Sequence, residues 1–269
     1  HTHEVGETIP DLYNEHVSGK YRYTNELLAC GDINSLSVGS METLRETVRT
    51  IIDEAKTESS IVTAAVYVRD LDNGPWMGLN EKALFYPASM LKLPLIIALY
   101  KEAENDPKLL DKKIAFEAPV IQRTDLLFPP SHPIEVGKSY TMRELARRAL
   151  VYSDNEAAAL AGNEVGFTNI AQAFSDLGIP EPKPGEDYQL SVRTYGSFLR
   201  VLYNASYVKR DYSEEILKML SESEFQNGIS VGVANGIAVA HKFGEREGEV
   251  VDIQRETHRI PLQLHVPFL

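Results

Sequence analysis

The chain has 269 residues, of which 43% are hydrophobic and 25% are charged, so it can bury a sizeable core in one large domain or two closely packed ones. Its net charge of −12 argues against a nucleic-acid or anionic-membrane partner. No apolar stretch reaches the roughly 18 residues needed to cross a bilayer, so the sequence predicts no transmembrane segment.

Residues 1–40 lack clear hydrophobic periodicity and predict an irregular N-terminal arm wrapped around a domain that spans 41–269. The chain begins at His1 and its first methionine is Met41, which indicates a processed or engineered fragment. Cys30 is the only cysteine, and we interpret it as a small buried hydrophobic residue. The seven histidines lack the spacing of metal ligands, so neither a metal nor another cofactor is expected.

Signals for one helix and two strands follow the arm. Ser40 is a candidate N-cap for a helix with one apolar face. The apolar residues of that face are Leu44, Val48, Ile51 and Ile52. Residues 61–68 are rich in Val and Ile and predict a strand, which an Asp-Asn-Gly-Pro turn at 72–75 joins to a second strand near 76–79.

Helical signals dominate from Ser89 onward. Thr141 and Glu144 form a capping box that opens an amphipathic helix. Further helices are expected over 156–164, 169–177, 191–203 and 213–220.

The rest of the chain predicts loops and a return to strands. A loop rich in Pro, Gly and charge covers 178–187, and a strand at 237–243 is followed by a predicted charged turn at 245–249. The order of strands, many helices and strands again predicts an α/β sandwich. Its antiparallel sheet would be built from both chain ends, with an all-helical block inserted over about 85–228.

Ser89 and Lys92 form an S-x-x-K pattern at the start of an apolar run, 93–100. On a helix, this spacing places hydroxyl and ammonium on one face, where a lysine whose pKa is lowered by apolar neighbours would activate the weakly nucleophilic serine. The exposed N–H groups of a first helical turn would favour an oxyanion. The alternative is a serine that only caps a helix beside a surface lysine. Ser206 and Lys209 repeat the pattern, and we set them aside because no apolar helix follows them.

Ser153, Asp154 and Asn155 follow the helix that ends near Leu150. A hydroxyl at this helix junction can relay a proton, and the Asn155 amide can hydrogen-bond both a lysine and a substrate carbonyl. The alternative is a helix N-cap, for which all three residue types are preferred. The two interpretations are compatible.

Lys242, Phe243 and Gly244 end the predicted strand at 237–243. Strand alternation directs Lys242 and Gly244 to one side and Phe243 to the other. Lys242 would attract a substrate carboxylate, Gly244 would let substrate backbone lie close, and the N–H of Glu245 would pair with that of Ser89 as an oxyanion hole. The alternative is a lysine on a solvent-facing strand end.

These three elements in this order resemble the signature of class A β-lactamases and penicillin-binding proteins. The separations, 64 residues from Ser89 to Ser153 and 89 from Ser153 to Lys242, suit that architecture, and the resemblance covers about 40–244. It implies a β-lactamase/transpeptidase-like fold.

The resemblance also implies a role for each matching residue. Ser89 would be the acylated nucleophile, Lys92 its general base, and Ser153 the proton relay to the leaving nitrogen. Asn155 would orient the substrate, and Lys242 would anchor a substrate carboxylate.

The chain departs from the family pattern in its loop and its last motif. The loop over 178–190 lacks the E-x-x-x-N pattern that carries the deacylating glutamate of class A enzymes, and we interpret Glu181 and Glu186 as solvated carboxylates. Phe243 stands where the family has Thr or Ser, which removes a hydrogen bond to a substrate carboxylate worth roughly 1.5–3 kcal/mol. We therefore expect slow deacylation and weaker recognition of carboxylate-bearing β-lactams.

The C-terminal part is shorter than in the family. Only 25 residues follow Gly244, whereas the family ends with two more strands and a helix. Residues 262–269 would supply one short strand, interrupted by Pro267, and the missing elements would leave an unpaired sheet edge. A truncated chain, a part absent from this sequence and an unfamiliar closure are the three explanations.

The leading hypothesis is a serine acyl-enzyme hydrolase or a D,D-peptidase or transpeptidase that acts on a D-alanyl peptide of peptidoglycan or on a β-lactam amide. One alternative is a class A-like β-lactamase with atypical deacylation, and another is a catalytically silent binding or scaffold protein. The family's substrates imply a periplasmic or secreted location.

Overall fold

The computed structural model describes residues 21–25, 35–58, 63–71, 74–121, 126–183, 185–234, 236–246, 249–256 and 263–268. Most of the predicted N-terminal arm, including Cys30, lies outside these ranges, as do the first two residues of the strand predicted at 61–68. Among the described residues, no helix combines the length and the apolar character needed to cross a membrane.

The α-helices are α1 (Ser35–Glu58), α2 (Lys92–Glu102), α3 (Met142–Val151), α4 (Asn155–Val165), α5 (Phe167–Asp176), α6 (Val192–Tyr203) and α7 (Arg210–Ser221). Three short 3₁₀ turns are η1 (Ala88–Leu91), η2 (Pro107–Asp111) and η3 (Ile229–Gly232).

The strands form four hydrogen-bonded groups. They are β1 (Val66–Arg69) with β2 (Trp76–Leu79), β3 (Leu84–Phe85) with β6 (Leu190–Ser191), β4 (Lys113–Ala115) with β5 (Ser139–Thr141), and β7 (Val239–Arg246) with β8 (Glu249–Glu256) and β9 (Gln263–Phe268). All of these pairings are antiparallel.

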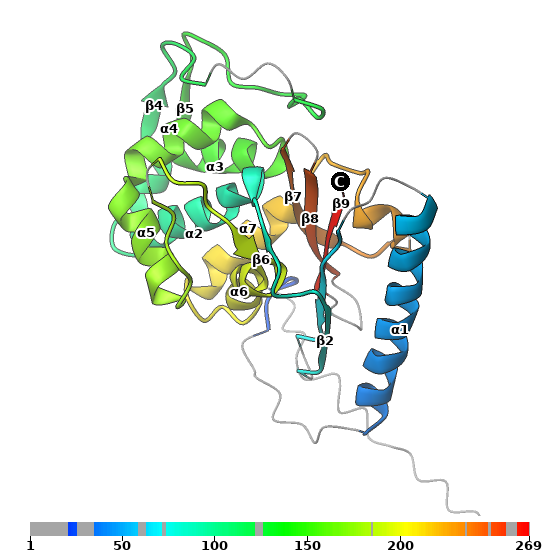
Figure 1. Cartoon of the computed structure of the whole chain (residues 1–269). Helices are drawn as coiled ribbons and strands as arrows, with labels where there is room; N and C mark the ends of the chain where they lie inside the picture. The colour runs from blue at the N-terminus through cyan, green and yellow to red at the C-terminus, as the bar shows by residue number, and fades with distance from the viewer. Residues whose placement is uncertain are drawn as a thin grey trace, which may run out of the picture.

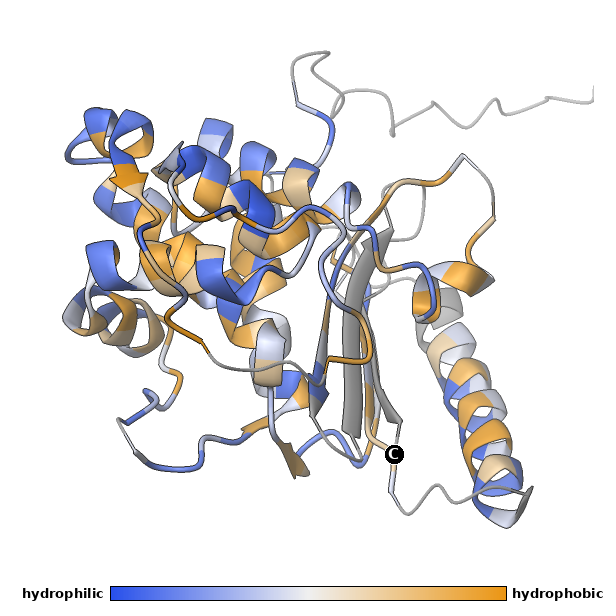
Figure 2. Cartoon of the chain, turned by 90° about the horizontal axis from the view of Figure 1, so that it is seen from above, coloured by the Kyte–Doolittle hydropathy of each residue, from blue (hydrophilic) through white to orange (hydrophobic). Residues whose placement is uncertain are grey.

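The molecule is layered, with the long strands between a helical block and α1 (Figure 1). The C-terminal strand β9 lies beside β1, so the sheet draws its strands from both chain ends. The view from above shows the same three layers, with apolar residues concentrated inside the helical block (Figure 2). The α/β sandwich with an inserted helical block, predicted from the sequence, is confirmed.

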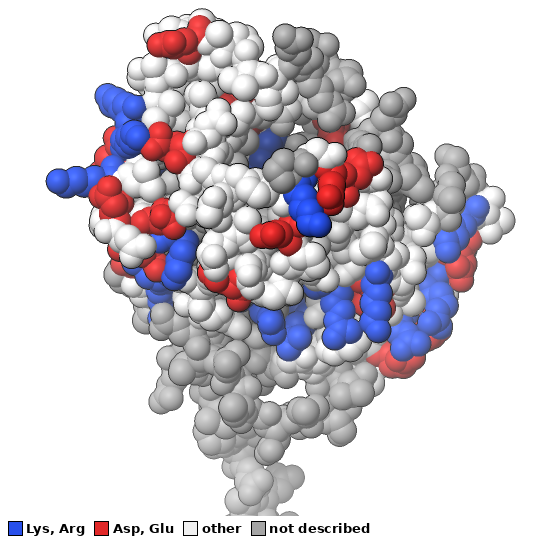
Figure 3. Space-filling view, turned by 60° about the vertical axis from the view of Figure 1, so that its left-hand side comes forward, with Lys and Arg blue, Asp and Glu red and all other residues white. Residues whose placement is uncertain are grey.

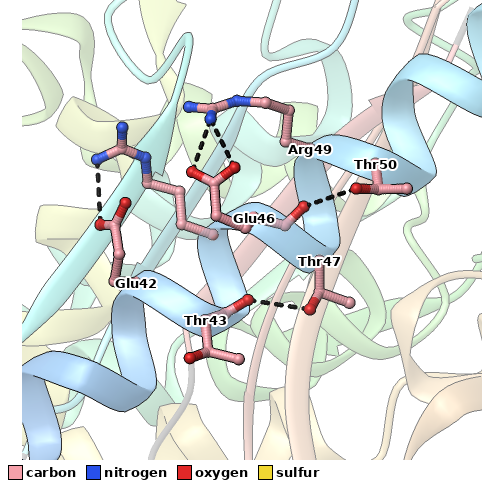
Figure 4. Close-up of polar contacts among 7 residues, drawn as sticks. Glu42, Thr43, Glu46, Thr47, Arg49 and Thr50 are labelled. Carbon is pink, nitrogen blue, oxygen red and sulfur yellow. Dashed lines mark hydrogen bonds and ion pairs between the residues drawn. The ribbon is translucent and has the colours of Figure 1, made fainter.

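Helix α1 covers one face of β1 and β2 through a narrow apolar seam. The seam consists of Met41, Leu44, Val48 and Ile52, which pack against the buried side chains of the two strands. Ile51, predicted to be part of the buried face, is 58% exposed because it lies at the edge of this seam. The outward face is polar, with ion pairs from Arg49 to Glu46 and from Arg45 to Glu42 and with threonines that donate to carbonyls one turn back (Figure 4).

The predicted cap of α1 at Ser40 is wrong, because the helix begins five residues earlier, at Ser35. Nothing in the intervening segment stops a helix. Gly39 is tolerated within it at a cost of about 1 kcal/mol relative to alanine.

Helix α2 is the centre of the helical block. All of its residues from Lys92 to Tyr100 are buried, as expected of a helix enclosed on every side. Helices α3, α4, α5 and α7 contact it. The predicted capping box at the start of α3 is confirmed: Thr141 Oγ1 accepts from the Glu144 N–H, and the Glu144 carboxylate accepts from the Thr141 N–H.

The C-terminal segment corrects two expectations. The charged turn predicted at 245–249 has the wrong bounds. Strand β7 continues to Arg246, β8 starts at Glu249, and these two residues pair with each other. A single short strand was also predicted after β7, but two strands follow it, and Pro267 lies within β9 opposite Val251. The extra strand, β8, forms because it pairs with β7 along eight positions.

Candidate active site

Ser89 lies in η1, the tight turn directly before α2. The preceding residue, Ala88, has φ +46°, a left-handed conformation that costs energy for any residue with a Cβ. Two contacts hold the turn in place: the Met90 N–H donates to the Pro87 carbonyl at 2.9 Å, and the Tyr195 hydroxyl donates to the Met90 carbonyl at 2.7 Å. The turn therefore fixes the position of a half-buried serine.

Lys92 contacts the first two predicted motifs. Its Nζ lies 3.0 Å from Ser89 Oγ, 3.1 Å from Ser153 Oγ and 2.7 Å from Asn155 Oδ1, and it also donates to the Ser153 carbonyl. The lysine is 6% exposed. The surface lysine considered as the alternative is therefore wrong.

The junction between α3 and α4 places its three polar residues by different means. Ser153 has φ +55°, which turns the chain sharply between the two helices. Asp154 is the helix cap: its Oδ1 accepts from the N–H of Glu156 at 2.9 Å and from the next N–H at 3.2 Å, and its Oδ2 accepts from the Ile134 N–H at 2.8 Å. Asp154 therefore caps the helix, while Ser153 and Asn155 contact Lys92. Each interpretation of the motif applies to different residues.

Strand β7 brings the third motif to the same place. Lys242 Nζ donates to Ser153 Oγ at 2.8 Å and to the Phe243 carbonyl at 2.8 Å. The side chain is completely buried, which rules out the solvent-facing strand end considered as the alternative. Ser153 Oγ therefore lies between two lysines, one from α2 and one from β7.

Gly244 allows β7 to pass against the turn that carries Ser89. A Cβ added at Gly244 would stand 2.5 Å from the Pro87 carbonyl oxygen, closer than real Cβ contacts, and 3.1 Å from Met90 Cγ, which is tight. A side chain at this position would push the strand and the turn apart. Glycine thus brings together the two backbone segments that contain the amides of Ser89 and Glu245.

The electrostatics of the site centre on Lys92. Burial lowers the pKa of its ammonium from 10.5 to about 7, and the negative charges of Asp154 and Glu245 oppose this shift. At neutral pH a substantial share of this lysine is an unprotonated amine. That form can accept a proton from a neighbouring hydroxyl.

Sequence reasoning assigned only the backbone amide of Glu245 and missed its side chain. The carboxylate is buried, with the residue 5% exposed. Its Oε1 accepts from the Phe128 N–H at 3.4 Å, and its Oε2 has no hydrogen-bond partner in the part of the chain that the structure describes. The sequence predicted a turn from Glu245 onward, and only the pairing of β7 with β8 shows that this residue belongs to a strand.

Phe243 belongs to an aromatic cluster that the sequence did not predict. Its ring stacks on that of Phe225 at 4.0 Å between centroids, and Phe128 meets both rings edge-on. Lys242 Nζ, which donates to Ser153 Oγ, also lies 4.3 Å from the centre of the Phe243 ring, so the two side chains are not kept apart as strand alternation predicted. The space of the missing hydroxyl is occupied by packed aromatic carbon.

The loop after α5 presents carboxylates to solvent. Glu181 is exposed, and the side chain of Glu186 is 66% exposed and 3.9 Å from Lys183. Both agree with the predicted solvated carboxylates. Asp187 is tied back toward the nucleophile turn, because its Oδ2 accepts from the Tyr86 hydroxyl at 3.2 Å.

The second S-x-x-K pattern lies away from this group. Ser206 and Lys209 are exposed, and Lys209 Nζ lies 3.7 Å above the ring of Tyr212. The prediction that no apolar helix follows this second pattern is wrong in part, because α7 follows it directly and has a buried face. Its lysine is nonetheless solvated and has none of the contacts that Lys92 makes.

Comparisons with known proteins show what this chain is similar to. Beta-lactamase L2 of Stenotrophomonas maltophilia is 31% identical over 109 residues, which are 40% of this chain and 35% of the length of that relative. A class A beta-lactamase from Mycobacterium abscessus has the same fold, with a TM-score of 0.66, 23% identity, and coverage of 77% of this chain and 84% of that one. A PBP-A variant in an acyl-enzyme complex with penicillin G gives a TM-score of 0.68, 18% identity, and coverage of 84% and 87%.

The family comparison spans most of the chain. The model of the "Beta-lactamase enzyme family" matches residues 43–253, which include most of α1, the helical block and the strand that carries Lys242. The chain therefore belongs to the beta-lactamase enzyme family.

Proposed function

We propose that this protein is a serine acyl-enzyme hydrolase or D,D-peptidase/transpeptidase that opens an amide bond through Ser89. The substrate class is a D-alanyl peptide of peptidoglycan or a β-lactam, which places the working protein outside the cytoplasm. The observation that carries the proposal is the buried Lys92 amine, which touches Ser89 Oγ, Ser153 Oγ and Asn155 Oδ1 at once.

In the proposed acylation, unprotonated Lys92 takes the proton of Ser89 while Oγ forms a bond to the substrate carbonyl carbon. The N–H groups of Ser89 and Glu245 stabilise the oxyanion. As the tetrahedral intermediate collapses, the carbon–nitrogen bond breaks and Ser153 passes a proton to the leaving nitrogen. The Lys92 ammonium, which contacts Ser153 Oγ, replaces that proton.

Lys242 and Asn155 complete the proposed site. Lys242 contributes a fixed positive charge beside Ser153 and favours an anionic substrate group, while Asn155 orients both Lys92 and the substrate amide. With Phe243 packed against Phe225, this position offers no hydroxyl to a substrate carboxylate, and the charge of Lys242 is the feature proposed to recognise it.

We propose that the acyl-enzyme is long-lived, as in a penicillin-binding protein. Glu181 and Glu186 are solvated, so neither is held in a position to activate a deacylating water. A class A-like β-lactamase with a different deacylating base is the rival, and the buried carboxylate of Glu245 is the observation in its favour.

The experiment is to incubate the protein with penicillin G and follow its intact mass. We expect one persistent penicilloyl adduct on Ser89, which should be absent from Ser89→Ala. In a separate reaction without penicillin, the wild-type protein should turn over nitrocefin slowly. Fast nitrocefin turnover without a trapped adduct would select the rival β-lactamase. A folded wild-type protein that no penicillin or fluorophosphonate labels would instead select the silent binding protein, which the buried Lys242 and the aromatic cluster favour.

The rate of acylation should depend on pH through Lys92. Because its pKa is about 7 and the neutral amine is the base, the rate should rise with pH, be half-maximal near pH 7 and fall about tenfold per unit well below it. The measurement is the second-order rate of Ser89 acylation between about pH 5 and 9.

A matched variant tests the origin of this pH profile. The negative charge of Glu245 raises the pKa of Lys92, so Glu245→Gln should move the midpoint to lower pH. A profile that is flat across this range, or a midpoint that moves upward in the variant, would contradict the assignment of Lys92 as the base.

A further inference from the structure

A second cavity lies between β1 and α6, with a volume of about 320 Å³. The beginning of the loop after α5 forms one wall, and no residue of the group around Ser89 lines it. Three arginines line it: Arg69 from β1 and Arg193 and Arg200 from α6. Thr194 and Ser197 add two hydroxyl groups.

The positive charge of this cavity is only partly compensated. Arg193 has a single acidic neighbour, Glu81, at 4.0 Å, the outer limit of an ion pair. Arg69 and Arg200 have no ion pair or side-chain hydrogen bond in the described part of the chain. Guanidinium groups facing one cavity repel one another unless an anion lies between them.

The sequence of α6 explains why these groups converge. Arg193, Ser197 and Arg200 are four and three residues apart, so they lie along one face of the helix. The same helix begins at Val192, and its N-terminal end adds positive potential beside Arg193. On the opposite wall, the carbonyls at the end of α5 already accept from the N–H groups of residues 177–179, so they compete little for the arginines.

Basic groups gather locally although the whole chain carries a net charge of −12. On the face drawn in Figure 3, Lys and Arg side chains stand in a row along the lower edge, whereas basic and acidic side chains are mixed elsewhere. A positive region on an acidic protein attracts small anions, whereas the negatively charged remainder of the surface repels them.

Trp76 does not line this cavity itself, but it is paired across the β1–β2 ladder with Arg69, which does, and it is 42% exposed. The guanidinium of Arg193 stacks 4.5 Å above its ring, and the ring of Tyr67, which lines the cavity, is 5.9 Å away. Arg193 thus touches both the cavity and the indole. Since Trp76 is the only tryptophan of the chain, its fluorescence reports on this place alone.

We propose that the cavity between β1 and α6 is a binding site for a small oxyanion that carries more than one negative charge, such as a phosphate or a polycarboxylate group. Arg69, Arg193 and Arg200 would bind it from three sides by charge-assisted hydrogen bonds, with Thr194 and Ser197 as further donors. This site is separate from the acylation chemistry and does not depend on it.

The test is calorimetric titration of the full chain with pyrophosphate, orthophosphate and citrate, alongside Trp76 fluorescence. We expect saturable binding of at least one of these anions and a parallel change in fluorescence. Arg69→Ala and Arg200→Ala should each weaken the binding by about tenfold or more, since each removes charge-assisted hydrogen bonds.

Arg49→Ala is the matched control, because Arg49 is a half-exposed arginine of α1 that pairs with Glu46 and should bind as wild type does. Thermal unfolding of each variant establishes that it is folded. The proposal is overturned if no anion binds saturably up to about 10 mM, if sodium chloride of equal ionic strength gives the same response, or if the three variants bind equally. None of these results depends on whether Ser89 can be acylated.

Discussion

We expect Lys92→Ala to lower the rate of Ser89 acylation at least ~10²-fold, because the substitution removes the base within reach of the hydroxyl. The loss should lie in the bond-forming step rather than in substrate binding, since Lys92 contacts Ser89, Ser153 and Asn155 and is 6% exposed. The measurement is the second-order rate of adduct formation with penicillin G, followed by intact mass.

Lys209→Ala is the control, because Lys209 belongs to the second S-x-x-K pattern. Its N–H donates to Glu104, which lies beyond the C-terminal end of α2, and α2 is about 15 Å long from Lys92 to that end. Acylation by this variant should equal that of wild type. An equal loss in both variants would mean that the wrong serine has been assigned, and a fold measurement on each separates loss of chemistry from loss of structure.

Phe243→Ala should lower the free energy of unfolding by about 3–5 kcal/mol, which is the usual cost of truncating a buried aromatic ring. Phe243 is 4% exposed, stacks on Phe225 and meets Phe128 edge-on, so its removal opens a cavity that neither neighbour can fill. Urea denaturation followed by far-ultraviolet circular dichroism measures the change.

Phe167→Ala is the matched control for this truncation. Phe167 begins α5 and is 47% exposed, so its loss should cost less than about 1 kcal/mol. If both variants lose the same small amount, the aromatic cluster contributes little to stability. The result also bears on specificity: a threonine at position 243 would restore a hydroxyl but remove the ring, so a gain in carboxylate recognition would be offset by a loss in packing.

The parts of the site that could be predicted from the sequence follow local rules. A serine and a lysine three residues apart on a helical segment meet, whatever surrounds them, and the capping box at Thr141 needs only its own turn. The order of the three motifs then placed Lys242 beside Ser153, although 89 residues separate them.

The parts that could not be predicted depend on pairing between distant segments. The strand β8 and the burial of Glu245 depend on the pairing of β7 with β8, which no short sequence pattern predicts. The pairs β3–β6 and β4–β5 contain two or three residues in each strand, too few for hydrophobic alternation to show. The arginine cavity joins β1 to α6, so Arg69 gave no signal of its own before the two were brought together.

A sheet that places its last strand beside its first has a consequence for how the protein matures. The helical block contains Ser89, Lys92 and Ser153, and the contacts among these three side chains involve no residue of β7, so they can form before that strand is made. Lys242 and the Gly244 contact with Pro87 arrive only when β7 has been made and can dock. A chain that lacks β7 would thus carry the serine and the lysine of the first motif without the second lysine beside Ser153, so the group of contacts is complete only once that strand has docked.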